Sequence, residues 1–123
     1  MVRYVLDSTV VVDHLRGHEG ATNWLATLDA VPLCSEVSRT EVLVGVRSDE
    51  RRAVETLFSS IDWVPVDEAV ARRAGDLGRR FRASHRLGAA DLLIAATVEG
   101  HRAVLATSNV RHFPMFPGLA SPY

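Results

Sequence analysis

Apolar residues follow two different spacings along this chain, and each change of spacing predicts a change of secondary structure. Short apolar runs bounded by polar or proline residues are typical of buried strands, and they occupy 3–7, 31–36, 62–67 and 103–107. Between them, apolar side chains recur every three or four positions or fill whole turns, which predicts helices over 21–28, 37–46, 53–61, 67–85 and 89–100. The last helix ends at Gly100, because glycine commonly terminates helices.

Two segments fit more than one interpretation. The run TVVVD within 8–16 fits either a helix or a strand, and Gly17 then supplies a stop. The tail from 113 to 123 is interrupted by prolines and has room for one short edge strand. Strands that alternate with helices indicate one α/β domain over 1–123, with a central, mostly parallel sheet and helices on both faces.

The amino-acid composition excludes several classes of functional site. All 14 basic residues are arginine, which excludes a phosphate loop or a Schiff base that needs a lysine amine. The net charge of −1 confines any nucleic-acid contact to a local patch. Cys34, the single cysteine, lies in an apolar run and is expected in the core. With no run of membrane-spanning length and no secretory leader before Val2, we expect a cytoplasmic protein with no membrane association.

Asp7 stands where an apolar strand ends, so its carboxylate comes close to the interior. It can cap the following helix, a common task of aspartate, or it can ligate a metal ion. In parallel sheets, ligands bind beyond the carboxyl ends of the strands, which is where Asp7 lies.

Two further carboxylates lie on apolar helices. Glu41 shares a helical face with Ser38 and Gly45, whose small side chains leave room beside it. Asp91 is in the first turn of the most apolar helix, where the helix dipole contributes only about 0.3–1 kcal/mol. Burying an unpaired carboxylate costs several kcal/mol, so a positive group should face Asp91.

Two polar residues follow the last predicted strand. Asn109 and Thr107 are each either ordinary turn residues or part of a site, since an amide oxygen can coordinate a hard cation. Together with the carboxylates they gather near the strand ends, and like charges held close in a crevice imply a bound cation. Oxygen ligands predict Mg²⁺, with Mn²⁺ as a substitute, at Asp7, Glu41, Asp91 and Asn109.

Four segments carry a family resemblance over nearly the whole chain. VLDSTVVVDHLRG, SEVSRTEVLVG, LGAADLLIAAT and LATSNVRHF resemble, in this order and spacing, the PIN domains of VapC-type ribonuclease toxins. The resemblance implies a magnesium-dependent endoribonuclease with acids at Asp7, Glu41 and Asp91 and a fourth polar position at Asn109. Thr107 matches a hydroxyl near the family's site, and Ser8 is a candidate at its other edge.

The resemblance also implies partners: an RNA substrate, a small VapB-type antitoxin that blocks the site, and a second copy in a homodimer. Asparagine at 109, where many members have aspartate, weakens the case for a second metal ion. Apolar residues at 42–46 and 57–61 supply either core packing or a groove for a partner helix. Arg111 and the arginines over 72–86 are candidates for phosphate contacts or a solvated surface, and Arg39 for pairing with an acid.

Three other interpretations compete with the toxin. Two are nucleases of the same superfamily, one acting on DNA and one in ribosomal-RNA processing, although the small size favours the toxin. A catalytically silent module can use the same acids to bind a partner's arginines. The five histidines are expected to be structural, His112 within a structural part of the tail.

Overall fold

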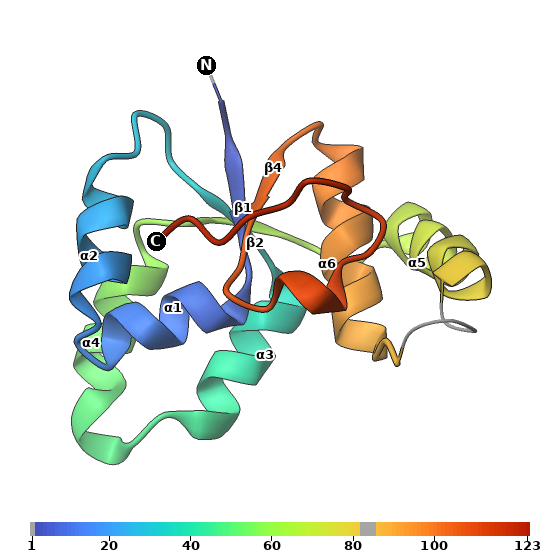
Figure 1. Ribbon diagram of the computed structural model, residues 1–123. Coiled ribbons are helices and arrows are strands. Elements are labelled where there is room, and N and C mark those ends of the chain that lie inside the picture. The colour runs from blue at the N-terminus through green and yellow to red at the C-terminus, as the bar shows by residue number, and fades with distance from the viewer. Residues whose placement is uncertain (1, 82–85) are drawn as a thin grey trace.

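The computed structural model describes residues 2–81 and 86–123, in which four short strands form one sheet. Helices surround this sheet (Figure 1). The strands are β1 (Tyr4–Leu6), β2 (Leu33–Ser35), β3 (Asp62–Val64) and β4 (Val104–Ala106). Their order is β3-β2-β1-β4, and each neighbouring pair is parallel. The predicted α/β fold is confirmed, and the carboxyl ends of β1 and β4 lie side by side.

Helices connect the strands and account for about half of the described residues. They are α1 (Ser8–Leu15), α2 (Glu19–Ala26), α3 (Glu36–Gly45), α4 (Arg51–Phe58), α5 (Glu68–Phe81) and α6 (Ala89–Gly100), with 3-10 turns η1 (Ser48–Glu50) and η2 (Val110–His112). The run TVVVD is therefore helical, because Asp7 caps its first turn. Residues 82–85 of the predicted helix 67–85 lie outside the described residues.

Two details of the expected elements are wrong. The tail from 113 to 123 forms turns and no strand, because its prolines lack the amide donors that a sheet ladder requires. The helix expected over 53–61 ends at Phe58, and Ile61 is buried just before β3 instead. No helix in residues 2–81 or 86–123 has both the length and the apolar character to cross a membrane.

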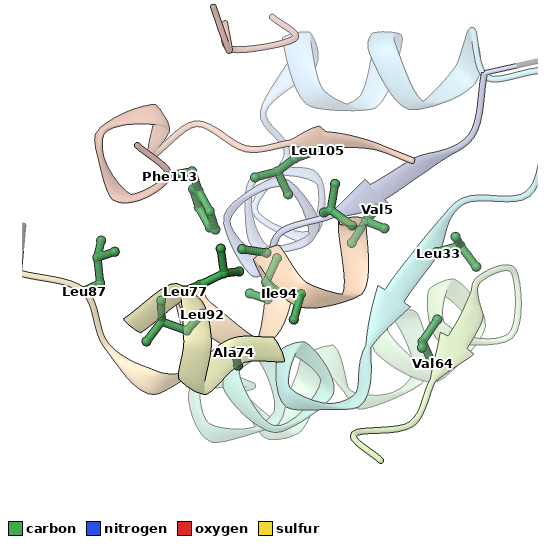
Figure 2. Packing of buried hydrophobic residues seen from close by; sticks show 13 residues of the cluster. Val5, Leu33, Val64, Ala74, Leu77, Leu87, Leu92, Ile94, Leu105 and Phe113 are labelled. Atoms are coloured by element: carbon green, nitrogen blue, oxygen red, sulfur yellow. The ribbon is translucent and has the colours of Figure 1, made fainter. Parts of the chain in front are cut away.

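Alternating side chains of the strands build a core on each face of the sheet. Val5, Leu33 and Leu105 point to the face covered by α5 and α6, where Phe113 from the loop after η2 completes the packing (Figure 2). Leu6, Cys34 and Ala106 belong to the second cluster, with buried residues of α1, α3 and α4. Both faces are therefore covered, as the pattern predicts, and the strand ends are left as the accessible edge.

Glycine positions offer a test of this backbone. Gly75 lies on the exposed side of α5, where an added methyl group contacts nothing, so Gly75→Ala should stabilise the protein by about 0.5–1 kcal/mol. Gly17 has a φ of 81° after α1, so Gly17→Ala should destabilise it by about 1–2 kcal/mol. Urea unfolding of both variants measures these changes, and opposite signs would contradict the assigned conformations.

Candidate active site

Asp7 is held at the carboxyl end of β1 by hydrogen bonds to both of its oxygens. Its Oδ1 accepts the Ser8 amide at 2.9 Å, which is the capping contact of α1. Its Oδ2 accepts the Thr107 hydroxyl at 2.6 Å and the Thr9 hydroxyl at 3.1 Å. With only 4% of its surface exposed, Asp7 is both the helix cap and a carboxylate in a fixed orientation.

Thr107 and Asn109 join this carboxylate through the loop after β4. The buried Thr107 hydroxyl donates to Asp7 and accepts the Asn109 backbone amide at 2.9 Å. The Ser108 amide donates to the Thr9 hydroxyl at 3.2 Å. The Asn109 backbone is therefore held next to Asp7, and the residue as a whole is exposed to solvent.

Glu41 approaches from α3 and completes one side of the site. The residue as a whole is exposed, and it lines a small cavity of about 100 Å³ between α1 and α3, together with Val12 and Gly45. The Ser8 side chain lies close enough to its carboxylate to lower the pKa of Glu41. Ser38, on the same face, is fully buried, so only the Gly45 end of the predicted small-residue stripe lines the space beside Glu41.

Like charges at the site act on one another. Burial raises the pKa of Asp7, and the nearby Asp91 carboxylate raises it further, while the hydrogen bonds from Thr107, Thr9 and Ser8 oppose the change. Loss of solvent around the carboxyl also raises the pKa of Glu41, with further contributions from the charges of Asp7 and Asp91. The three carboxylates predicted from the sequence are thus electrostatic neighbours.

Asp91 meets a partner that the sequence interpretation missed. It is in the first turn of α6, and its Oδ2 lies 3.2 Å from Nδ1 of His112 in η2. The group that faces Asp91 is therefore the His112 imidazole. The signal was present in the motif SNVRHF, since a single 3-10 turn after Asn109 places His112 beside the strand ends. Arg39 instead pairs with Glu36 at 2.6 Å and lies over the Trp63 ring.

The donor chemistry fits a hard divalent cation. Carboxylate oxygens are the ligands that Mg²⁺ and Mn²⁺ prefer, and a bound cation would offset the repulsion that Asp91 adds at Asp7. As they stand, no three acidic, histidine or cysteine side chains within 2–81 and 86–123 are drawn together closely enough to hold an ion.

The remaining candidates lie outside this cluster. Cys34 is buried, and burial raises the pKa of its thiol to about 12, which confirms a core role. Arg72 pairs with Glu68 and Arg79 with Asp76, so these two belong to a solvated surface. His85 lies outside the described residues.

Exposed apolar side chains lie on α3, beside a cavity between α3 and α4. Leu43 is 42% and Val44 is 83% exposed, and Leu43, Val46 and Val54 line a cavity of about 450 Å³ with Arg51 and Glu55. Val42, Phe58 and Ile61 are buried instead, so half of the groove expected over 42–46 and 57–61 is core.

Comparisons with known proteins agree with this geometry. The model of the PIN domain matches residues 4–116. The chain is 48% identical to Ribonuclease VapC19 of Mycobacterium tuberculosis over 97% of this chain and 98% of that protein, and 47% identical to Ribonuclease VapC10 over 97% and 92%.

Solved structures share the fold. A toxin-antitoxin complex from Klebsiella pneumoniae superposes with a TM-score of 0.83 at 25% identity, covering 98% of both chains. VapBC2 from Rickettsia felis, bound to a DNA fragment from its promoter, gives 0.83 at 20% identity, covering 98% and 97%. Since one family model and two relatives of nearly half-identical sequence span this chain almost completely, it belongs to the PIN-domain family.

Proposed function

We propose that this protein is a VapC-type endoribonuclease, the toxin of a toxin–antitoxin pair, and that it hydrolyses RNA phosphodiester bonds with Mg²⁺. The observation that carries the proposal is the buried Asp7 carboxylate, fixed by three hydrogen bonds at the carboxyl end of β1, with the charges of Asp91 and Glu41 nearby. In a chain 48% identical to a protein named as a ribonuclease, this cluster is best explained as the reaction centre.

The proposed ligands of the metal ion are the three carboxylates and Asn109. Asp7, Glu41 and Asp91 would hold Mg²⁺ or, in its place, Mn²⁺, with Asn109 as a fourth ligand. When bound, the ion lowers the pKa of a water molecule and neutralises charge on the phosphate. Asp7 Oδ1 accepts one hydrogen bond and Oδ2 two, so acceptor capacity is left on Oδ1.

Thr107 and His112 act through the carboxylates. Thr107 keeps the Asp7 carboxyl in one orientation by donating to Oδ2, which also favours its charged form. His112 contacts Asp91 and limits where that carboxylate can turn.

The proposed partners of the protein are an antitoxin and a second copy of the chain. A VapB-type antitoxin would cover the acidic site, and a partner helix can pack on the exposed apolar residues of α3, of which Val44 is one helical turn after Glu41. Homodimer formation, which the family resemblance implies, stays a prediction. RNA as the substrate places the working protein in the cytoplasm.

Replacing one carboxylate separates chemistry from folding. Asp91→Asn should lower RNA cleavage by at least about 100-fold, the upper end of what changes around metal ligands cost, while the melting temperature stays equal or rises. Stability is preserved because the substitution removes repulsion with Asp7 and Glu41. Mg²⁺ should also raise the melting temperature of the wild type more than that of the variant.

The matched control is Asp76→Asn, the same chemical change at an exposed carboxylate of α5 that pairs with Arg79. It should leave cleavage and the Mg²⁺ response unchanged. Wild-type cleavage by folded Asp91→Asn would rule out the ligand assignment, and cleavage of DNA in preference to RNA would favour the other nucleases of the superfamily.

Antitoxin and metal should compete for the same carboxylates. An arginine of the antitoxin can bind two carboxylate oxygens at once, so we expect Asp7→Ala to weaken the complex about 10-fold or more, as the loss of a charged hydrogen bond does. Excess Mg²⁺ or Mn²⁺ should weaken the complex as well and restore cleavage.

The measurement is a titration of Mg²⁺ into the toxin with and without the antitoxin encoded beside it, recording partner affinity and RNA cleavage together. If excess metal changes neither quantity, and Asp7→Ala binds the antitoxin as the wild type does, inhibition does not act through the acidic site.

A further inference from the structure

We infer that Thr9, which the sequence patterns do not single out, is a positioning residue. It sets the orientation of the Asp7 carboxylate and the position of the loop after β4. The inference rests on the proposed function, since it concerns how well the site accepts a divalent cation. Thr9 is the second residue of α1, and its hydroxyl lies between Asp7 and the backbone of Ser108.

The hydrogen-bond directions make this hydroxyl a bridge. A threonine hydroxyl has one proton to donate. That proton goes to Asp7 Oδ2 at 3.1 Å, because the Ser108 amide at 3.2 Å is itself a donor and can only be accepted. The hydroxyl therefore cannot turn away from Asp7 without giving up one of its two contacts.

Thr107 forms a second bridge of the same design. It donates to the same Oδ2 at 2.6 Å and accepts the next amide of the loop, that of Asn109, at 2.9 Å. Two hydroxyls from elements about 100 positions apart in sequence thus converge on one oxygen. With Oδ2 occupied twice, the carboxyl group keeps a single rotational setting, and Oδ1 is the oxygen left for a cation.

The two bridges differ in burial, and this makes Thr9 the better one to test. Thr107 is fully buried, so removing its hydroxyl would leave the Asn109 amide without an acceptor inside the protein. Thr9 is half-buried, and valine has the same shape, so Thr9→Val removes the bridge with little change in packing. Water can then reach the Ser108 amide, and the fold tolerates the change.

The loop depends on the same contact. Ser108 immediately precedes Asn109, and the 3-10 turn that follows carries His112 to Asp91. The hydrogen bond between the Ser108 amide and α1 therefore sets the positions of Asn109 and His112 relative to Asp7. Loss of the bridge should loosen the loop and spread the carboxylate over several orientations, which weakens binding of the cation more than the chemistry that follows.

The experiment compares wild type with Thr9→Val, Thr9→Ser and Thr27→Val. Thr27 is an exposed threonine at the end of α2 whose hydroxyl bonds only a backbone carbonyl, so Thr27→Val controls for the loss of a hydroxyl. For each protein, RNA cleavage is measured against Mg²⁺ concentration, the melting temperature is measured with and without Mg²⁺, and exchange of the Ser108 amide is followed by NMR.

Thr9→Val should raise the half-saturating Mg²⁺ concentration by about 10-fold, with a smaller effect on the maximal rate. Its Mg²⁺-induced rise in melting temperature should shrink, and its Ser108 amide should exchange faster. Thr9→Ser should restore all three quantities, and Thr27→Val should leave them unchanged.

Equal Mg²⁺ dependence in Thr9→Val and wild type, in cleavage and in melting temperature, would overturn the inference. A wild type that does not cleave RNA would instead contradict the proposed function. In that case the Mg²⁺-induced change in melting temperature, compared between Thr9→Val and wild type, still decides the role of Thr9.

Discussion

Burial of the Asp7 carboxylate at the end of β1 is the constraint around which the rest of this structure is arranged. A charge with 4% of its surface exposed is costly unless its lone pairs are occupied, and three donors occupy them here. One donor is the first amide of α1, and two are hydroxyls from α1 and from the loop after β4. The same contacts therefore begin α1, hold the loop after β4 and fix the orientation of the Asp7 carboxylate.

The pairing of β1 with β4 makes this arrangement possible. Leu6 stands opposite Ala106 in the parallel register, so the next residue of each strand, Asp7 and Thr107, comes to the same edge. The Asp7 amide also donates to the Ala106 carbonyl at 2.9 Å. Backbone pairing thus delivers the two side chains to each other, and hydrogen bonding then sets their orientation.

Repulsion among the carboxylates is tolerated because the rest of the fold offsets it. Each face of the sheet is covered by an apolar cluster, and the helices that bring Glu41 and Asp91 belong to those clusters through buried neighbours such as Val42 and Leu92. A site that raises the pKa of its own carboxyls stores electrostatic free energy. A positive charge placed among these carboxyls would release part of it.

Local patterns of the sequence determined the elements and the residue types of the site. Apolar spacing sufficed for the alternation of strands and helices, and the bounds of α6 agree with its run 89–100, because burial imposes those periods on any sequence. The acids stood out because carboxylates interrupt apolar segments. Only the tertiary structure decided that Asp7 caps α1 and also accepts the Thr107 hydroxyl, that His112 faces Asp91, and that Thr9 bridges Asp7 to Ser108. These contacts join residues far apart in sequence or depend on the direction of a single hydroxyl, and the spacing of apolar residues carries information on neither. The expectations for the tail and for Ile61 were wrong for a related reason, since distant partners set how these residues pack.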